Sequence, residues 1–483
     1  MRSKLSGKLA QWNQSQAEPP PKRPRTVKVL ITLAGIMAVG AGGLWYLHPR
    51  LATAGLDPWV RLTLQGDRQM DSHDPTSAID SYERAWALRP DEAELAAKLG
   101  DARAADGDFS GAVESYNAAV TLAPDDPTYR IKRGDVHAAA GHHEIAVADY
   151  DQAISLKPDH AGALRQRAAA KLEVGDYQGA VDDAAKSIAV KLDDPGPFRV
   201  RGRARLALGD PAGALADLDE SIRLAPDSAI ALHARGRAKQ MLGDAGGAES
   251  DHNRAILIEP VNPDYYIDRA LARRARGNLT GAITDLAKAI ELRPKDARAH
   301  LERANARRDR GDRHGAVADY TRAIELEPGR AVAYFHRGIT RAAWGKPTAA
   351  VADFNKVIEL EPTNIDALIA RSDAKERSRD FGGAITDLNQ VLHLDPKHAY
   401  AYCARGDIRR ELGDYPNAIQ DYDHAIQAKP DYGYAYYSRG QARWDSGDPG
   451  GAVSDFRWVV DRSTDPSLVK LATQYLSAAG NMQ

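Results

Sequence analysis

Two hydrophobic patterns divide the chain. The first is an uninterrupted apolar stretch from Val29 to Leu47, nineteen residues without a charged side chain, which is close to the length of a helix that crosses a bilayer. In the second, from about residue 59 on, small, apolar and charged residues recur in one pattern every 34 residues. A fixed period of this length is typical of stacked helical repeats, so we expect an all-α solenoid after the apolar stretch.

Proline marks the period most visibly. With this proline set as position 32, twelve repeats fill residues 59–466 without an insertion, and only Leu192 and Thr464 replace it. Proline cannot continue a helix, so each repeat is predicted to turn at this point into the next one. The ten prolines on the grid are Pro90, Pro124, Pro158, Pro226, Pro260, Pro294, Pro328, Pro362, Pro396 and Pro430.

Each repeat is predicted to form two antiparallel helices. Position 20 is alanine in all twelve repeats, and position 8 is always Gly, Ala or Ser, which allows two helix backbones to approach closely. Position 15 is glycine in ten repeats, which suits the turn that ends the first helix. A polar residue that follows, such as Asp108 or Asp414, is suited to starting the second helix.

Taken together, these positions identify a family. The stretch from Arg201 to Pro226, RGRARLALGDPAGALADLDESIRLAP, resembles the tetratricopeptide repeat, with its small-8, Gly-15, Ala-20, aromatic-24, small-27 and Pro-32 pattern. The resemblance covers about 408 of the 483 residues. It implies a right-handed superhelix whose first helices line a concave groove, and a non-enzymatic scaffold that binds a protein or peptide there. It does not identify the partner, because such scaffolds serve many.

After the last repeat, residues 467–483 are predicted to form a closing helix and a short tail. Such a helix shields the apolar end of a solenoid. Its apolar face is expected to consist of Leu468, Leu471, Ala472, Tyr475, Leu476 and Ala479.

One pair of positions departs from the family pattern. Position 7 is Arg and position 23 is Asp in the same ten repeats, from Arg133 with Asp149 to Arg439 with Asp455, and the first two repeats lack both residues. Because they occur together, we predict that they form a ladder of partly buried ion pairs. Position 11 adds Lys or Arg in ten repeats, one turn further along the first helix. Most of the regularly spaced charges are therefore assigned to the scaffold.

The amino-terminal residues are predicted to set the topology. Residues 1–28 form a Pro-rich tail with seven Lys and Arg residues against the single acid Glu18, which favours a cytoplasmic location for this end. Residues 29–47 are then a transmembrane helix, 48–58 a linker, and the repeats are exported, into the periplasm if the cell is a bacterium. As an alternative, Ala52-Thr53-Ala54 fits a cleavage site, so that the apolar stretch is a removed signal peptide.

Composition narrows the possible functions further. The formal net charge is only −2, so no overall field draws the protein to nucleic acid. The single cysteine, Cys403, permits neither an internal disulfide nor a cysteine-based metal site. The sequence contains no GxxxxGK[ST], HExxH, GxSxG or CxxC motif, so we predict no catalytic residue, metal or cofactor.

The resemblance assigns the groove chiefly to positions 2, 5, 9 and 12. In the fourth to sixth repeats these positions hold Arg165, Arg199, Arg203, His233 and Arg237 without an acid. They are predicted either to bind a carboxylate-rich peptide or an anionic polysaccharide, or to form an ordinary solvated face. In the polysaccharide case the protein belongs to a cell-envelope export or assembly machine.

A second group of groove positions is aromatic. It consists of Tyr400, Tyr434, Tyr437 and Trp444, which suit an extended peptide or sugar rings. The neighbouring Tyr402, Tyr422 and Tyr436 are expected to pack in the core of the last repeats.

Overall fold

The computed structural model describes residues 56–480, which fold into 25 α-helices without a β-strand. They form two compact parts, an N-terminal part that ends at Val174 and a C-terminal part that begins at Gly175. The predicted tail at 1–28, the predicted span at 29–47 and most of the predicted linker lie outside the described residues. Within residues 56–480, no helix combines the length and the apolar character that a membrane crossing requires.

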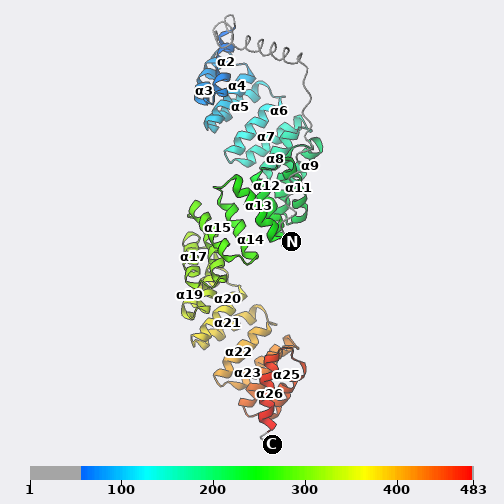
Figure 1. Cartoon of the computed structure of the whole chain (residues 1–483), viewed down its shortest axis with the longest axis vertical. Coiled ribbons are helices and arrows are strands. Elements are labelled where there is room, and N and C mark those ends of the chain that lie inside the picture. Colours follow the sequence, from blue (N-terminus) through cyan, green and yellow to red (C-terminus); the bar gives the residue numbers. More distant parts are fainter. Residues whose placement is uncertain (1–55, 481–483) are drawn as a thin grey trace, which may run out of the picture. The chain divides into compact units, whose positions relative to one another are not determined.

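The N-terminal part contains the first three helical hairpins and the first helix of the fourth repeat (Figure 1). Its helices are α2 (Pro58–Asp71), α3 (Pro75–Leu88), α4 (Ala93–Asp106), α5 (Phe109–Leu122), α6 (Pro127–Ala139), α7 (His143–Leu156) and α8 (Ala161–Val174).

The C-terminal part contains the second helix of the fourth repeat, eight complete hairpins and a closing helix (Figure 1). The helices of the fourth to eighth repeats in this part are α9 (Tyr177–Val190), α10 (Pro195–Ala207), α11 (Pro211–Leu224), α12 (Ala229–Met241), α13 (Ala245–Ile258), α14 (Pro263–Ala275), α15 (Leu279–Leu292), α16 (Ala297–Asp309) and α17 (Arg313–Leu326). They are followed by α18 (Ala331–Ala343), α19 (Pro347–Leu360), α20 (Ile365–Arg377), α21 (Phe381–Leu394), α22 (Ala399–Glu411), α23 (Tyr415–Ala428), α24 (Gly433–Asp445), α25 (Pro449–Arg462) and α26 (Pro466–Gly480).

The small residues at positions 8 and 20 lie where each hairpin closes, as predicted. All twelve alanines at position 20 are completely buried. Position 8 faces the large residue at position 24 of the same repeat: a Cβ atom added to Gly338 would lie 2.7 Å from Phe354, and one added to Gly406 would lie 2.8 Å from Tyr422. Side chains at these positions therefore limit how closely the two helices pack.

The turn inside each hairpin has a left-handed residue at position 15. The ten glycines at this position have φ between 74° and 89°, a region that glycine enters without a steric penalty. The two repeats without glycine keep the same turn, with His73 at φ 60° and Arg379 at φ 61°. The next residue usually caps the second helix, as Asp108 does by accepting a bond from the Gly111 amide. Asp414 is different, because its carboxylate accepts the side-chain amide of Asn417 instead.

The second helix of every repeat ends at position 30, before the proline at position 32. It ends at the same position where the proline is missing, at Val190 before Leu192 and at Arg462 before Thr464. The residue at position 31 has left the helical region in both cases, with Lys191 at ψ 103° and Ser463 at ψ 135°. Proline therefore reinforces a helix end that the packing of the next hairpin also imposes.

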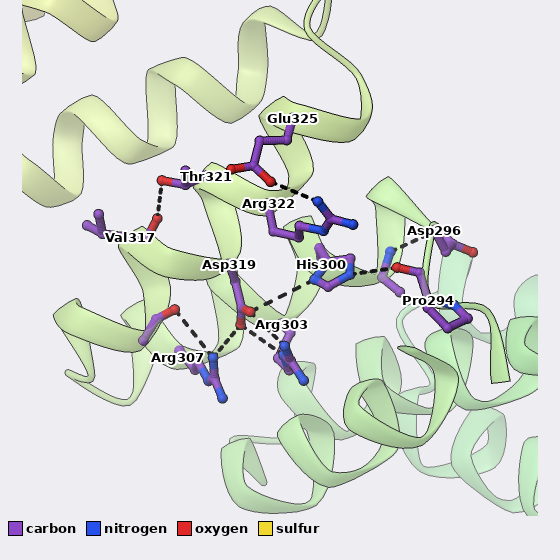
Figure 2. Close-up of polar contacts among 12 residues, drawn as sticks. Pro294, Asp296, His300, Arg303, Arg307, Val317, Asp319, Thr321, Arg322 and Glu325 are labelled. Carbon is purple, nitrogen blue, oxygen red and sulfur yellow. Dashed lines mark hydrogen bonds and ion pairs between the residues drawn. The ribbon is translucent and has the colours of Figure 1, made fainter. Parts of the chain in front are cut away.

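The predicted pairs of Arg at position 7 with Asp at position 23 form within the hairpins of nine repeats, the third and the fifth to twelfth. In the fourth repeat the two residues belong to different parts. The eighth repeat shows the geometry (Figure 2): Arg303 donates from Nε and Nη2 to the two carboxylate oxygens of Asp319 at 2.9 and 2.7 Å. Arg307, at position 11, donates to the same carboxylate at 2.6 Å.

In most repeats the arginine at position 7 also bonds to the preceding repeat. Its Nη1 reaches the polar side chain at position 25 there, as Arg269 does to Asn253 at 2.8 Å and Arg371 to Asn355 at 2.9 Å. One guanidinium thus connects three helices. Burial would raise the pKa of Asp319, but His300, 4.0 Å away, and the bonds and charges of Arg303 and Arg307 hold that pKa below its usual range.

The predicted closing helix is α26, which covers the last hairpin. Ala472 is fully buried, and the ring of Tyr475 stacks on Phe456 with the centroids 4.6 Å apart. Leu471, which we expected on the buried face, is 41% exposed.

Candidate binding surface on the first helices

Side chains at positions 2, 5, 6, 9 and 12 of the first helices line hollows between consecutive repeats. Two hollows in the N-terminal part have volumes of about 220 and 430 Å³, and one in the C-terminal part has about 280 Å³. The first helices of neighbouring repeats contact one another in both parts, for example α6 with α8 and α22 with α24. We call the row formed by these positions the first-helix face.

In the N-terminal part, two of the three aspartates at position 9 are neutralised by a lysine of the next repeat, whereas Asp135 accepts the neutral amide of Gln166 at 3.1 Å. Asp67 accepts bonds from the Lys98 ammonium at 2.8 and 2.9 Å, and Asp101 accepts one from Lys132 at 2.6 Å. Both lysines occupy position 6 of their repeats. Each aspartate also accepts a tyrosine hydroxyl from position 24 of its own hairpin, as Asp67 does from Tyr82 at 2.8 Å.

The predicted basic stretch contains an acid that the sequence reasoning missed. Asp268, at position 6 of the seventh repeat, is buried and accepts a bond from His233 Nε2 at 2.7 Å. Its other oxygen accepts Arg298 at 2.5 Å, and the Arg237 guanidinium lies 3.9 Å away. Two of the five predicted basic residues are therefore held by one carboxylate. Asp268 was not predicted as a groove residue because it stands at position 6, and the family resemblance assigns the groove chiefly to positions 2, 5, 9 and 12.

The other three residues of that stretch are partly buried. Arg165 lies in the N-terminal part and Arg199 and Arg203 lie in the C-terminal part, and each interacts with another group of the chain.

The groups around Asp268 have shifted ionisation. Burial would raise the pKa of Asp268, but the hydrogen bond and charge of His233 hold it well below its usual range. Burial lowers the pKa of the neighbouring His252 to about 4, so this ring is neutral at physiological pH. His252 stands at position 24, where most repeats have an aromatic ring or leucine, and its ring centroid lies 5.4 Å from that of His233. Neither ring nitrogen of His252 has a hydrogen-bond partner among the described residues.

The structure separates the four aromatic residues predicted for the groove. Tyr400 and Tyr434 are exposed on the first-helix face. Tyr437 is 8% exposed and contacts Phe456, and Trp444 packs edge-on against Tyr475 of α26. The last two therefore belong to the terminal core, because the closing helix covers that end of the face.

Tyr422, one of the tyrosines expected in the core, is fully buried. Tyr402 and Tyr436 are partly buried, and each lies under the arginine at position 7 of its repeat, with 5.6 Å and 5.3 Å between guanidinium carbon and ring centroid. Tyr436 also stacks on Trp458 at 3.7 Å.

Tyr400 and Tyr434 line a pocket of about 280 Å³ between α20, α22 and α24. Three acids that the sequence reasoning did not single out share this pocket, and we call it the acidic tyrosine pocket. It is formed chiefly by Asp373, Glu376, Asp407, Tyr400, Tyr432 and Tyr434.

Burial raises the pKa of all three carboxyl groups. For Glu376 the neighbouring charges of Asp373 and Asp407 add to the increase. Burial also raises the pKa of Tyr400 to about 12, so its hydroxyl stays protonated and donates to Asp373 at 3.4 Å. Within residues 56–480, no group of three or more His, Cys, Asp or Glu side chains is arranged to hold a metal ion. Cys403, which also lines the pocket, is buried, and burial raises the pKa of its thiol.

Two family models match segments of the repeat region. The family model described as "Tetratricopeptide repeat" matches residues 63–127, 131–197, 199–264 and 301–365, and the model described as "TPR repeat" matches 270–307 and 406–447. No curated protein sequence matches the chain.

Several solved structures are similar over parts of the chain. MamA is 26% identical over 33% of this chain and 93% of its own, with a TM-score of 0.32. Yeast Tom70 is 18% identical over 88% of this chain and 96% of its own, with a TM-score of 0.36. YrrB, described as a TPR protein with an unusual peptide-binding site, is 21% identical over 39% of this chain and 96% of its own, with a TM-score of 0.33.

Proposed function

We propose that this chain, which belongs to the tetratricopeptide repeat family, is a membrane-anchored, exported scaffold that binds a partner protein or peptide on its first-helix face. Proteins of this family generally mediate protein–protein interactions. The observation that carries the proposal is how the charges are divided between two surfaces. Arginines and aspartates at positions 7, 11 and 23 bond to one another inside the hairpins, whereas positions 2, 5, 9 and 12 line the hollows.

The hollows differ from one repeat to the next, which suits recognition of a specific sequence. The pocket at Trp59 carries Lys98 and Asp67, the environment of Asp268 is basic, and the acidic tyrosine pocket carries three acids. Within the C-terminal part, an extended segment lying along this face meets the basic surroundings of Asp268 at one repeat and the acidic tyrosine pocket at another.

In the polysaccharide alternative, the basic stretch in the fourth to sixth repeats contacts an anionic glycan. The contacts of Asp268 weaken it, because His233 and Arg237 share a buried carboxylate inside the protein. The peptide-binding function is therefore the one we propose.

Site-specific photocrosslinking in intact cells tests the binding face. The exposed position-2 residues Ile230, Val332 and Tyr400 are each replaced by p-benzoylphenylalanine in the full-length chain. The control position is Leu257 on the second helix α13, which is 82% exposed and lies outside the first-helix face. We expect one common partner protein to be captured from the three first-helix positions and not from Leu257. Equal capture from all four positions, or from none, would contradict the proposal.

The anchor and the export are tested separately. The apolar stretch at 29–47 and the basic residues before it support a retained helix with the repeats outside the cytoplasm. Mass spectrometry of the protein extracted from membranes should recover peptides from residues 1–28, and external protease should digest the repeats only after the outer barrier is opened. A mature chain that starts just after Ala54 would show that the stretch is a cleaved signal peptide.

A further inference from the structure

The acidic tyrosine pocket contains more negative charge than the chain neutralises. Asp373, Glu376 and Asp407 are partly buried and form no ion pair within 4 Å of a described basic residue, whereas buried carboxylates such as Asp387, Asp421 and Asp455 do. The nearest cations act only at longer range, and Arg410 pairs with Asp445 at 3.4 Å instead.

The hydrogen bonds that these acids do make come from neutral donors. Tyr422 and Tyr434 each donate to one oxygen of Asp407 at 2.8 Å, and Tyr400 donates to Asp373 at 3.4 Å. No hydrogen bond to Glu376 is formed by the described side chains. Its carboxylate thus faces the pocket beside two further acids, an arrangement that costs free energy in the unbound protein.

In two other repeats of the chain, a lysine pairs with the aspartate that corresponds to Asp373 and Asp407. Asp373 and Asp407 stand at position 9, as Asp67 and Asp101 do in the first and second repeats. There the next repeat supplies an ammonium from position 6, Lys98 or Lys132, at 2.6–2.9 Å from the carboxylate. In the eleventh repeat the same position is Ala404, which lines the pocket. The pocket therefore lies where a lysine lies in the second and third repeats, whereas the neutral Gln166 occupies this position in the fourth repeat.

The tyrosines of the pocket also favour a cation as the ligand. Tyr400, Tyr432 and Tyr434 border the pocket, and the faces of aromatic rings attract cations. An ammonium is a compact charge with three donors, which matches three carboxylates better than a planar guanidinium does. The cavity of about 280 Å³ accommodates the end of an alkyl chain.

We propose that the acidic tyrosine pocket receives the ammonium group of a lysine side chain from the bound partner. This inference rests on the proposed function, since it assigns a residue type to one point of the segment that lies on the first-helix face. The incoming ammonium takes the place that Lys98 and Lys132 fill in their own repeats, and it neutralises the carboxylates that the protein leaves unpaired.

A peptide titration tests the ligand chemistry. The probe is the acetylated and amidated peptide Gly-Gly-Lys-Gly-Gly, added to the full-length chain and followed by ligand-observed NMR. Peptides with norleucine or acetyl-lysine in place of the lysine test the charge, and one with arginine tests the shape of the cation. We expect binding of the lysine peptide alone. Equal binding of the norleucine peptide, or stronger binding of the arginine peptide, would contradict the assignment.

Two variants locate the binding. Glu376→Gln should weaken the lysine peptide about tenfold, because one charge-assisted bond is lost. Asp461→Asn is the control: it also removes one negative charge, at an exposed residue of the second helix α25, outside the first-helix face and outside the pocket. It should leave the affinity unchanged, and an equal loss in both variants would reduce the effect to general attraction by a negative surface.

Supplying the missing side chain gives an independent readout. Ala404→Lys should place an internal ammonium beside Asp373, raise Tm and abolish peptide binding. Ala404→Met, of similar length without charge, should block the peptide without raising Tm. If Ala404→Lys lowers Tm as much as Ala404→Met does, and Glu376→Gln binds like the wild type, the inference is wrong.

The failure of this inference differs from the failure of the proposed function. Capture of the same partner by photocrosslinking in wild type and Glu376→Gln, without any binding of the lysine peptide, would leave the scaffold function and remove the pocket assignment. Binding of the lysine peptide without capture at any first-helix position would leave the pocket as a binding site for an ammonium group and remove the scaffold function.

Discussion

At the scale of single residues, the turn inside each hairpin requires a left-handed backbone at position 15. Ten repeats satisfy it with glycine, and two do so with His73 and Arg379. For a residue with a Cβ this conformation costs about 1–2 kcal/mol. The turn persists in both repeats because the helices on either side are held by the rest of the hairpin.

We therefore expect Arg379→Gly to stabilise the protein. The gain should be about 0.5–1 kcal/mol, because relief of the strain is partly offset by the greater flexibility of glycine in the unfolded chain. The measurement is the urea midpoint of the full-length variant. Arg379→Ala keeps the strained backbone and serves as the control, so a similar shift in both variants would exclude the backbone as the cause.

Contacts that recur in nearly every repeat could be predicted from the sequence, whereas contacts that occur at only a few pairs of repeats could not. The small residues at positions 8 and 20 and the glycine at 15 could be predicted because the same contact recurs in nearly every repeat. The contacts of Asp268, Asp373 and Asp407 could not, because each joins positions of two different repeats and changes from one joint to the next. Tyr437 and Trp444 share the spacing of groove residues, and only the position of α26 places them in the core.

At the scale of elements, the hairpins of the fifth to twelfth repeats each contain one buried carboxylate that accepts from two basic side chains. Asp285 is 3% exposed and accepts from Arg269 at 2.6 and 2.9 Å and from Arg273 at 2.7 Å. The sequence predicted the pairing of positions 7 and 23 from their joint occurrence. It did not predict that the same guanidinium also bonds to the preceding repeat, as Arg269 does to Asn253.

Replacing one partner of this pair should be worse than replacing both. Asp285→Ala leaves two guanidinium groups without their buried acceptor, and the expected loss is about 3–5 kcal/mol. The double variant Arg269→Leu, Asp285→Tyr substitutes apolar groups and should lose clearly less. Urea unfolding of the two variants measures the difference, and equal losses would mean that the pair contributes no coupling.

At the scale of the whole molecule, acidic pH should destabilise the protein by protonating several buried carboxylates. For Asp251, Asp268 and Asp319, burial raises the pKa and the contacts with Arg, Lys or His lower it, and the net result is a pKa below the reference value of 3.8. A folded-state pKa below the unfolded value stabilises the protein above the unfolded value. That contribution is lost as the pH falls through the folded pKa.

The urea midpoint should therefore be steady near neutral pH and fall below about pH 4. The acidic tyrosine pocket acts in the opposite direction, because its raised pKa values mean that protonation relieves the repulsion. Glu376→Gln should accordingly raise the midpoint at pH 7 relative to wild type and lose this advantage as the pH falls through the pKa of Glu376. If the urea midpoint of Glu376→Gln at pH 7 were below that of wild type, the ionised Glu376 carboxylate would stabilise the protein, and this prediction would be wrong.

In most repeats the arginine at position 7 bonds backward to the preceding hairpin and inward to its own, and each of these bonds joins residues 16 positions apart. A gene duplication or deletion of 34 codons inside the array would therefore bring the same positions together at the new junction, whereas loss of a single codon would shift them out of register there. The chain can lengthen or shorten during evolution in whole steps, and each step adds or removes one chemically distinct hollow on the recognition surface.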